Sequence, residues 1–458
     1  MRVLLVRPNL NKKTTTVKNF MFGEPLGIEC VSTILKELGH EVLLVDLLAE
    51  SKRNMKKYIK KFDPDVVGFT SQCTDIDNIL ILAEDVKRMK KNVKVIVGGI
   101  QATISPEAYF NKNVDYVFKS TTRENYKQLM EQIENGTSEE IAGIYSRKRQ
   151  YQVTLPSCQN EYVKPDREGT AKYRKKYKYV GYSPCAILQT SYGCKNHCKF
   201  CVRWKIEGAK VVELPIEDVV AEIESLNEQY IMIIDNDFLA NEKRLLQFLD
   251  LLENRKIKKK YIIYGSVNNI IDKEYIFERL SKNGVVAVIV GYESFDNKQL
   301  KEWTNKTTKD GNVKATQILR KNKIAVWGSF ILHPDFSKDD FKRLIKYHKT
   351  LKPELLTFSP LVPHPLTPLY NEYKDRLIYD QEDYEKWNFG DVLIYPSKMT
   401  LKQYYWEILK FGIPINLNWH SVKYMLTAFP LKNTLRMIFG FNQSIGIYIK
   451  NIFSRRVR

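Results

Sequence analysis

The sequence predicts an α/β fold made of an open parallel sheet at the N-terminus, a partial barrel of six strand–helix units, and a helical C-terminal extension. Apolar runs typical of strands alternate with helical patterns twice along the 458 residues. These strands are apolar throughout, as strands covered on both faces are. The length is that of two or three domains. We expect domains at residues 1–135 and 185–370, a linker at 136–184 and the helical extension at 371–458.

The first sheet is expected from five short apolar runs. Strands are predicted at 2–6, 41–46, 65–69, 93–97 and 115–118, and helices at 26–38, 52–62, 75–91 and 122–133. Ligands bind such sheets at the carboxyl ends of the strands, so the candidate binding residues lie in the following loops: Pro8, Asn9, Gly98, Gly99 and Thr103. The paired glycines would let the backbone approach a flat ligand closely, or they serve only to turn a tight loop. A dinucleotide is not expected, because no G-x-G-x-x-G follows the first strand.

The second set of strands begins after a stretch of loops. Residues 136–184 contain prolines and polar segments, with a hairpin predicted near 143–153. Beyond them, strands are predicted at 186–190, 231–234, 261–264, 285–290, 324–331 and 354–359, and helices at 216–228, 242–254, 273–281, 313–322 and 338–351. Six such units form a partial βα barrel, in which reactive residues belong at the carboxyl ends of the strands.

Three of the seven cysteines stand within eight residues, directly after the first barrel strand. They are Cys194, Cys198 and Cys201, in a C-x3-C-x2-C pattern. Three cysteines are one ligand short of the four that complete a [4Fe–4S] cluster, which leaves one iron open to a non-protein ligand. A structural zinc site is the alternative. It fits less well, because His197 stands between two of the cysteines and no further cysteine follows.

With the aromatic Phe200 just before its last cysteine, this run resembles the signature of the radical SAM superfamily. The resemblance implies that S-adenosylmethionine (SAM) chelates the open iron through its amino and carboxylate groups. It also implies that the reduced cluster cleaves SAM to a 5′-deoxyadenosyl radical, with Phe200 in the cofactor site.

Acidic and polar residues after two later strands resemble the SAM contacts of that superfamily. Asp235 and Asp237 follow the second barrel strand, where family members hold the amino group of SAM. The alternative is an Asx turn with solvated acids. Glu293 and Ser294 follow the fourth strand and resemble the family's G-x-E-S, where both residues approach SAM. A buried structural glutamate is the alternative there.

Other barrel strands also end in polar side chains. The third strand ends near Ser266 and Asn268, which would meet the methionine carboxylate of SAM. The last two strands run into His333 and His364, candidates for proton transfer at the barrel mouth. A lone histidine is more often a packing or capping residue, so both readings stay open.

Residues 1 to about 135 resemble the cobalamin-binding domain of the B12-binding radical SAM family. The matching positions are Pro8, Asn9, the G-E-P-L-G turn at 23–27, the strand at 64–68 and the G-G-x-x-A-T of residues 98–103. The resemblance implies a Rossmann-like fold and bound cobalamin. Gln101 stands where the family has a histidine, and K-S-T-T-R-E at 119–124 replaces an acidic turn. No D-x-H-x-x-G motif is present in this segment, so no histidine is assigned to cobalt.

Composition places the chain among ordinary globular proteins, with 43% hydrophobic residues. An uneven number of cysteines and no recognisable signal peptide predict a reducing cytoplasm. No apolar run approaches the roughly 20 residues that a membrane-spanning helix needs. The net charge of +20 fits nucleic acid, an anionic membrane surface or an acidic substrate. A lysine-rich surface without such a partner is the alternative, and because the lysines are scattered, nucleic acid is not expected.

The C-terminal segment combines an apolar repeat with basic residues. The apolar positions recur at three and four residues: Leu435, Ile438, Phe439, Ile445, Ile449, Ile452 and Phe453. The basic positions are Arg436, Lys450, Arg455, Arg456 and Arg458. A basic amphipathic helix lies readily on an anionic bilayer, but the same pattern serves equally as a cap on the barrel. Two glycines, Gly440 and Gly446, weaken the segment as a helix.

These observations predict a cobalamin-dependent radical SAM methyltransferase acting on a small-molecule or lipid-like substrate. In the family's reaction, methylcobalamin donates a methyl group to a substrate carbon radical. The expected partners are an electron donor of ferredoxin or flavodoxin type and, at the periphery, the membrane. One alternative is a radical SAM cyclase, oxidase or rearrangement enzyme with a degenerate cobalamin domain. Others are a methylthiotransferase acting on tRNA or protein, and an electron-transfer or iron-sensing protein without a SAM pocket.

Overall fold

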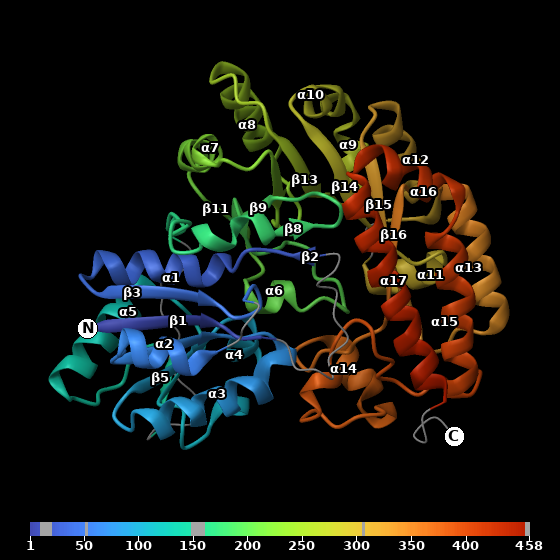
Figure 1. Cartoon of the computed structure of the whole chain (residues 1–458). Coiled ribbons are helices and arrows are strands. Elements are labelled where there is room, and N and C mark those ends of the chain that lie inside the picture. The colour runs from blue at the N-terminus through green and yellow to red at the C-terminus, as the bar shows by residue number, and fades with distance from the viewer. Residues whose placement is uncertain (10–20, 51–53, 148–160, 305–306, 454–458) are drawn as a thin grey trace. The chain divides into compact units, whose positions relative to one another are not determined.

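The computed structural model describes residues 1–9, 21–50, 54–147, 161–304 and 307–453. The chain divides into two compact units (Figure 1). Unit 1 comprises Met1–Thr14, Glu24–Lys176 and Gln381–Asn388, and unit 2 comprises Thr15–Gly23, Tyr177–Asp380 and Phe389–Arg458. Part of the stretch predicted to be a linker, 136–184, therefore belongs to unit 1 and part to unit 2.

Unit 1 is built on a six-stranded sheet in the order β3-β1-β4-β5-β6-β7. Its strands are β1 (Arg2–Arg7), β3 (Glu41–Asp46), β4 (Val66–Thr70), β5 (Lys94–Gly98), β6 (Tyr116–Phe118) and β7 (Ile144–Ser146). The first five are parallel, and β7 pairs antiparallel with β6. The five predicted strands are confirmed. The sixth arises where a hairpin was predicted, and the rest of that hairpin, from residue 148, lies outside the described residues.

Helices cover both faces of this sheet. They are α1 (Leu26–Glu37), α2 (Met55–Phe62), α3 (Ile76–Met89) and α5 (Arg123–Asn135), with the short α4 (Ile100–Ile104) after β5. Val3 and Leu5 of β1 pack with α1 and α5, whereas Leu4 and Val6 pack with α2 and α3. Successive side chains of a strand point to opposite faces. Burial on both faces therefore explains why the strands are apolar throughout.

Unit 2 contains a second six-stranded sheet, which is parallel in the order β16-β15-β14-β13-β12-β9. The strands are β9 (Cys185–Leu188), β12 (Tyr230–Ile233), β13 (Lys260–Tyr264), β14 (Val285–Glu293), β15 (Ala325–Leu332) and β16 (Leu355–Pro360). Neighbouring strands follow one another along the chain from β9 to β16, and the two end strands do not pair. The predicted partial barrel is confirmed.

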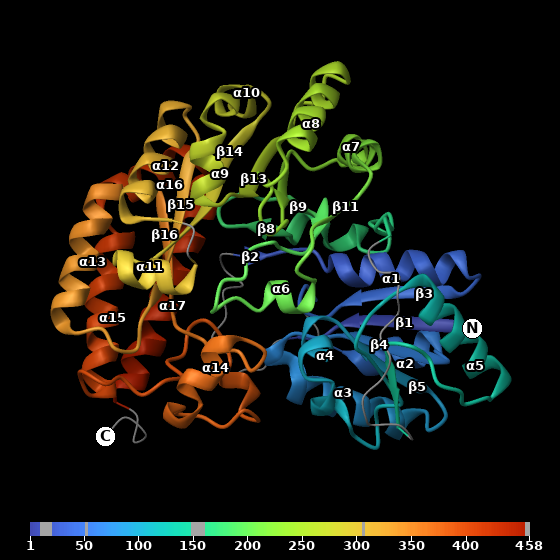
Figure 2. The ribbon, with the colours of Figure 1, turned by 180° about the vertical axis from the view of Figure 1, so that it is seen from behind.

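Helices flank the outer side of this sheet (Figure 2). They are α7 (Ile216–Ser225), α8 (Glu242–Asn254), α9 (Val267–Asp272), α10 (Phe277–Lys282), α12 (Lys309–Lys321) and α13 (Lys338–Leu351). The Asn241 side chain accepts the Arg244 N–H at the start of α8, and Ser337 and Asp340 form a capping box at the start of α13. Such caps satisfy backbone donors that a helix start leaves unpaired, and both helices have the predicted bounds.

Shorter elements complete unit 2 around the sheet. Two small antiparallel pairs join β2 (Met21–Phe22) to β8 (Lys178–Tyr179) and β10 (Ser191–Tyr192) to β11 (Val212–Glu213). The short helices are α6 (Arg203–Ile206), α11 (Asn297–Trp303) and α14 (Pro368–Tyr373). None of these elements was predicted from the sequence, because each is too short to show a periodic pattern.

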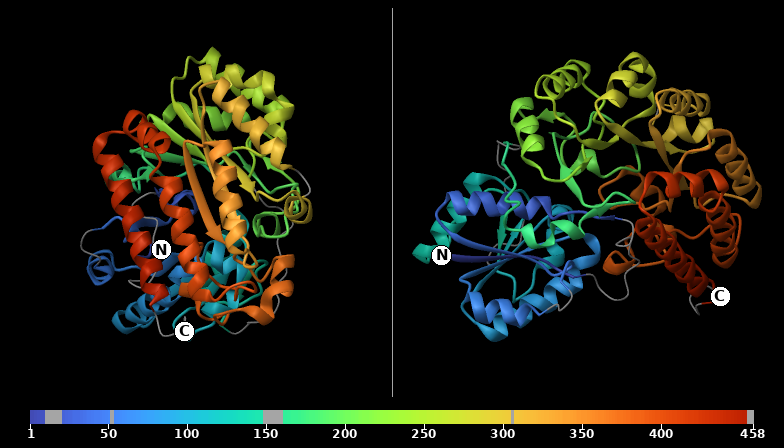
Figure 3. Two further views of the ribbon diagram at one scale, coloured as in Figure 1. Left: turned by 90° about the vertical axis from the view of Figure 1, so that its right-hand side faces the viewer. Right: turned by 45° about the horizontal axis from the view of Figure 1, so that its top comes forward.

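Three helices end the chain: α15 (Leu401–Asn416), α16 (Trp419–Ala428) and α17 (Leu431–Ile452). In Figure 3, α15 and α17 run side by side, and the rings of Tyr405 and Tyr448 lie 6.1 Å apart between them. Phe411 of α15 packs on Phe358 of β16 at 5.2 Å. The C-terminal helices thus cap the barrel sheet. Within the described part of the chain, no helix combines the length and apolar composition needed to cross a bilayer.

Candidate functional site

The three clustered cysteines lie in one loop of unit 2, at the carboxyl end of β9. The chain leaves β9, forms β10, and returns through β11, which pairs with β10 through Ser191↔Glu213 and Tyr192↔Val212. The loop between β10 and β11 carries Cys194, Cys198 and Cys201. Their position directly after the first barrel strand is therefore as predicted, and a short antiparallel stem fixes both ends of the loop.

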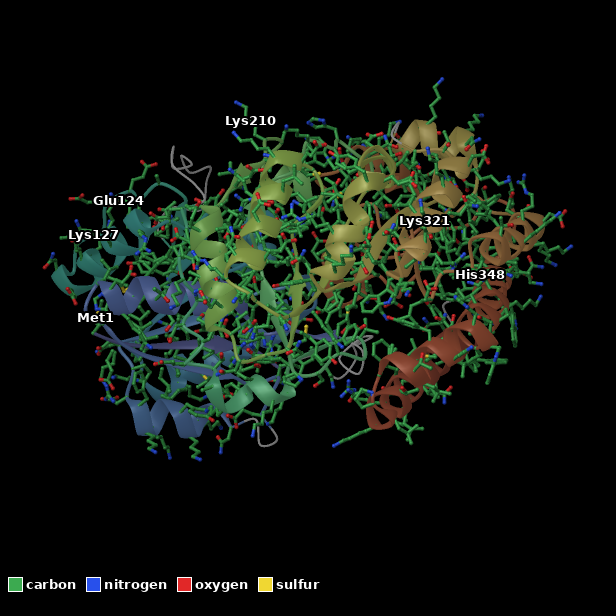
Figure 4. All side chains as sticks on the ribbon, turned by 90° about the horizontal axis from the view of Figure 1, so that it is seen from above. Met1, Glu124, Lys127, Lys210, Lys321 and His348 are labelled. Atoms are coloured by element: carbon green, nitrogen blue, oxygen red, sulfur yellow. The ribbon has the colours of Figure 1, made fainter. Side chains whose placement is uncertain are left out.

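Backbone contacts close this loop tightly beside its first cysteine. Gly193 has a left-handed φ of +81°, and a Cβ there would lie 1.9 Å from the carbonyl oxygen of Lys210. The Cys194 N–H donates to the Gly208 carbonyl at 3.1 Å. The Lys210 side chain points outward (Figure 4), so only its backbone faces the loop. Glycine at 193 is thus required for both conformation and space.

The thiols have the chemistry of cluster ligands. All three cysteines are thiols outside any disulfide, and all three are half-buried. Burial, above all, raises the pKa of Cys201, and the nearby Cys194 and Glu293 raise it further. Among the described residues, no three acidic, cysteine or histidine side chains are gathered closely enough to hold one metal ion. In a [4Fe–4S] cluster each cysteine binds a different iron, so three thiols are the donor set for three of the four irons.

Aromatic packing supports the far side of the loop. The Phe200 ring meets Trp303 edge-to-face at 5.9 Å, and the Lys199 N–H donates to the Trp303 carbonyl at 3.0 Å. Phe200 was predicted to lie in the cofactor site. In the structure it belongs to a cluster with Leu361 and Leu369, and its contact with SAM stays a prediction. Trp303 ends α11 and gave no signal in the sequence.

The acidic turn after β12 is hydrogen-bonded to the cysteine loop. The Asp235 carboxylate accepts the Thr190 N–H at 2.6 Å, the Thr190 hydroxyl at 2.6 Å and the Ser191 hydroxyl at 2.7 Å. The Asn236 amide donates to the Gly193 carbonyl at 2.9 Å and to Glu207 at 2.7 Å. Burial raises the pKa of Asp235, and these hydrogen bonds oppose the rise. The turn therefore fixes both the entry and the base of the loop.

The third residue of the turn is bonded to the opposite side, toward α9. Asp237 accepts the Asn269 amide at 2.7 Å and the Ser266 N–H at 3.3 Å. The Ser266 hydroxyl caps α9 by accepting the Asn269 N–H. Asn268, predicted beside Ser266 as a SAM contact, is exposed on that helix. Asn269 was missed, because the short α9 was not predicted and only the helix brings this amide to Asp237.

Glu293 differs from these acids because, among the described residues, burial and no hydrogen bond accounts for its shifted pKa. It ends β14 at a register shift against β15 and has a left-handed φ of +58°, which is strained for a residue other than glycine. Burial alone raises the pKa of Glu293 to about 7. The neighbouring Ser294 hydroxyl donates to Gln299 and accepts the Asp296 N–H. Glu293 is thus a half-buried acid suited to a cationic ligand.

His333, at the end of β15, lies in an aromatic cluster. Its ring stacks on Trp303 at 5.4 Å, and burial lowers its pKa. Nδ1 accepts the Asp335 N–H at 3.0 Å, which assigns the proton to Nε2, 3.2 Å from the Tyr373 hydroxyl. Both ring nitrogens of this neutral imidazole are thus hydrogen-bonded within the protein. This fits the interpretation of His333 as a packing residue. His364, after β16, is also neutral, because burial lowers its pKa to about 4.

The carboxyl edge of the unit 1 sheet is formed by β4 and β5. Gly99 has a φ of +102°, and a Cβ there would lie 2.7 Å from the Ser71 nitrogen. The Ser71 hydroxyl donates to the Gly98 carbonyl at 3.0 Å and accepts the Ala102 N–H at 3.3 Å. Gly99 is exposed, so this edge presents backbone without a side chain. Such a surface fits a broad, flat cofactor.

The other predicted residues of this edge bond to the protein. Asn78 donates to the backbone carbonyl of Asn9 at 2.5 Å and to its side-chain oxygen at 3.2 Å. The Thr103 hydroxyl donates back to the Gly99 carbonyl at 3.3 Å within its own turn. Pro8 is buried beside Asn9 at the end of β1. These residues shape the edge, and their contact with a cofactor stays a prediction.

Two residues at this edge carried no signal in the sequence. Asp75 lies after β4, and burial raises its pKa to about 6, with Oδ1 buried and unpartnered among the described residues. The Cys73 thiol donates to the carbonyl of Tyr384, which lies in the 381–388 segment of unit 1. That segment is more than 300 positions away along the chain, so no local pattern could have revealed the contact.

No histidine is available to the unit 1 edge from within the unit. His40 is the only histidine before residue 197. It lies at the start of β3, the opposite end of the strands, where Nδ1 is 3.3 Å from the N-terminal nitrogen. Any cobalamin bound at the carboxyl edge would therefore lack a histidine ligand from unit 1, and the absence of histidine ligation stays a prediction.

Comparison with known proteins finds one known domain family in each half of the chain. The family model for the B12 binding domain matches residues 14–129, and that for the Radical SAM superfamily matches residues 188–348. The chain is similar to the hopanoid C-3 methylase of Methylococcus capsulatus, with 23% identity over 90% of this chain and 79% of the relative. It is also 23% identical to the anaerobic magnesium-protoporphyrin IX monomethyl ester cyclase of Rubrivivax gelatinosus, over 87% of this chain and 74% of the relative.

Among solved structures, the fold resembles the radical SAM methyltransferase TsrM from Kitasatospora setae, determined with cobalamin and a [4Fe–4S] cluster bound. The TM-score is 0.73 and the identity 16%, covering 98% of this chain and 99% of that one. At 16% identity, this similarity shows the fold alone. It extends over nearly the whole chain, including the C-terminal helices.

Proposed function

We propose that this chain, a radical SAM enzyme with a B12-binding domain, transfers a methyl group to an unactivated carbon of a small-molecule or lipid-like substrate. Its cofactors are a [4Fe–4S] cluster, SAM and cobalamin. The observation that carries the proposal is that one chain holds both sites. Unit 2 has a three-cysteine loop after β9, and unit 1 has a glycine edge without a histidine.

Each cofactor has identifiable residues in the chain. When bound, the cluster and SAM supply a substrate radical and cobalamin supplies the methyl group. Cys194, Cys198 and Cys201 would hold three irons, and Glu293 would accept the ammonium group of SAM. A cation beside this half-buried carboxyl would favour its charged form.

We assign the acidic turn after β12 a positioning role. Asp235 and Asp237 were predicted to contact SAM, but their carboxylates already accept hydrogen bonds from Thr190, Ser191 and Asn269. They would act by holding the cysteine loop on one side and α9 on the other. Replacing Asp235 with asparagine would then reduce cluster loading more than it reduces SAM affinity of the loaded protein.

The substrate class is inferred from chemistry and similarity together. Two relatives are named for a hopanoid and for magnesium-protoporphyrin IX monomethyl ester, and these names favour a lipid-like substrate here. Reduction of the cluster needs a low-potential one-electron donor, for which we propose a ferredoxin or flavodoxin. A reducing cytoplasm suits both the cluster and cysteines that are not joined in disulfides.

Similarity to the cyclase makes an oxidative or cyclising radical reaction the second candidate. The two reactions differ in how they use SAM. Methylation consumes one SAM to form the substrate radical and a second to remethylate cobalamin, so it releases 5′-deoxyadenosine and S-adenosylhomocysteine together. A cyclisation that does not transfer a methyl group releases no S-adenosylhomocysteine.

The test is an anaerobic assay of the full chain. The reconstituted protein is incubated with hydroxocobalamin, reductant, SAM labelled in its methyl group, and extracts of apolar metabolites. Release of both products and transfer of label to an extracted molecule would support methylation. Label transfer should be lost in Cys198→Ala and kept in Cys185→Ala. 5′-Deoxyadenosine without S-adenosylhomocysteine or label transfer would instead favour the second candidate.

A further inference from the structure

The three C-terminal helices expose an unusual amount of apolar surface. Ten of the seventeen large hydrophobic side chains exposed in the described chain lie between Trp406 and Phe453. Scattered single exposed hydrophobic residues are normal, whereas a concentration of them marks an interaction surface. The rest of the described chain, roughly 380 residues, carries only the other seven.

The exposed side chains form rows along the helices. On α17, Leu431, Leu435 and Phe439 follow one another at intervals of four and are 63%, 58% and 58% exposed. Ile449 and Phe453 continue the row. Met437 and Ile452 face inward and are buried. The predicted apolar repeat is thus divided: one side caps the barrel, and the other is left uncovered. A helix with two apolar sides needs a second apolar neighbour.

The row on α17 lies next to a second row on α15. There, Trp406 and Ile413 are each 41% exposed. The exposed Lys402 comes before Trp406, and the exposed Lys410 lies between Trp406 and Ile413. The Lys402 ammonium lies 5.7 Å from the centre of the Phe453 ring. Since α15 and α17 also run side by side (Figure 3), their exposed rows form one surface, here called the C-terminal surface.

The charged residues of these helices are basic with one exception. Between residues 401 and 452 the basic side chains are Lys402, Lys410, Lys423, Lys432, Arg436 and Lys450. The only acidic residue in that range is Glu407, which is buried and paired with Lys410 at 2.9 Å. Lys432 and Lys450 are exposed beside the α17 row. Arg455, Arg456 and Arg458, which extend the basic sequence, lie outside the described residues.

We propose that the C-terminal surface docks on an anionic lipid bilayer. Exposed tryptophan and phenylalanine side chains with lysines beside them suit the boundary between acyl chains and headgroups. The near absence of acidic residues removes the repulsion that anionic headgroups would meet. Each lysine held near an anionic leaflet strengthens binding by about fivefold at low salt. This inference does not depend on the proposed reaction, although a membrane-dissolved substrate would suit it.

Sedimentation of the full chain with lipid vesicles tests the docking. The probes are vesicles of phosphatidylcholine alone and vesicles containing equal parts of phosphatidylglycerol. We expect co-sedimentation with the anionic vesicles at low salt and at least a tenfold loss of binding at about 1 M salt, where the Debye length is about 3 Å. The same extent of binding to neutral vesicles, or none to either, would overturn the proposal.

Two variants locate the contact. The double variant Leu435→Glu and Phe439→Glu changes two exposed side chains and should reduce anionic-vesicle binding at least tenfold. Ile81→Glu is the matched control, because Ile81 is 60% exposed on α3 of unit 1; it should bind vesicles like the wild type. Iron content and thermal melting confirm that each variant is folded. If the double variant binds vesicles normally, the C-terminal surface is not the membrane contact.

A second measurement covers the case in which the double variant fails to fold. Tryptophan fluorescence should be quenched by vesicles with brominated acyl chains, and the quenching should be weaker in Trp406→Phe, where Trp419, 74% exposed at the start of α16, still contributes. Unchanged quenching in that variant would exclude docking through α15. A wild-type dimer in solution that the exposed-row substitutions convert to a monomer, without vesicle binding, would show that a second copy covers this surface and would overturn the lipid proposal.

Discussion

Replacing Gly193 with alanine should prevent the cysteine loop from holding iron, whereas the same change at Gly208 should not. Both glycines lie between β10 and β11, and both have left-handed backbone, with φ of +81° and +98°. An alanine in this conformation costs about 1–2 kcal/mol at either position. The two sites differ in space. A Cβ at Gly193 would lie 1.9 Å from the Lys210 carbonyl oxygen, whereas a Cβ at Gly208 meets no atom within 4 Å.

The contact at position 193 can be relieved only by moving a cluster ligand or its support. Ordinary contact begins at 3.4 Å, so the backbone must shift by about 1.5 Å. Cys194 is the next residue, and its N–H donates to the carbonyl of Gly208, near the end of the loop that leads into β11. Metal–ligand distances tolerate deviations of about 0.2 Å. A shift of this size therefore moves the first thiolate out of bonding position.

The assay is iron and sulfide per chain after anaerobic reconstitution, together with the melting temperature of the unreconstituted protein. Gly208→Ala should load iron like the wild type and melt a few degrees lower. Gly193→Ala should lose most of its iron even where unit 2 remains folded. If both variants bind iron equally, the close approach at Gly193 does not determine the position of Cys194, and the reasoning is wrong.

Three further outcomes are expected. Cys198→Ala should abolish cluster absorption and SAM cleavage, and Cys185→Ala, buried in β9, should change neither; normal iron in Cys198→Ala would overturn the site. The full chain should bind hydroxocobalamin, and its reduced Co(II) spectrum should show no nitrogen splitting from a histidine ligand. His348, whose pKa burial lowers to about 4, stays neutral in the folded chain while the unfolded chain takes up a proton below about pH 6.5. The contribution of His348 to the free energy of unfolding should therefore be fully present above that pH and fall by about 2 kcal/mol between pH 7 and 5. In denaturant titrations, His348→Leu should reduce this loss.

Much of the architecture could be predicted because it is encoded locally. The strands of both sheets are apolar runs, and α8 and α13 begin at the caps Asn241 and Ser337, so their bounds came out as predicted. The two domain families and the cofactor set, predicted from short motifs, are confirmed. By contrast, α17 is a continuous helix despite Gly440 and Gly446. Packing against α15 outweighs the weak helix propensity of glycine.

The contacts of the site residues could not be predicted, because they join distant parts of the chain. Asp235 has the residue type of an ammonium ligand, yet its carboxylate is bonded to Thr190, 45 positions away. Ser266 has the character of a ligand-binding residue and also caps α9. His333 is surrounded by Trp303 and Tyr373, each brought to it by a helix too short to be predicted. A single sequence shows residue types, and the long-range partners decide their roles.

The return of residues 381–388 to unit 1 has a consequence for how the protein is made. Unit 1 is complete only when this segment reaches it and Tyr384 accepts the Cys73 thiol, and unit 2 in turn includes β2 from near the N-terminus. At about 5–20 residues per second, the ribosome needs roughly 10–40 s to travel from Lys176 to Gln381. During that interval the nascent first unit waits with the end of β4 uncovered. Neither unit can be obtained whole by a single cut in the gene, and a nascent chain arrested before residue 381 should be more sensitive to protease around Cys73 than the released protein.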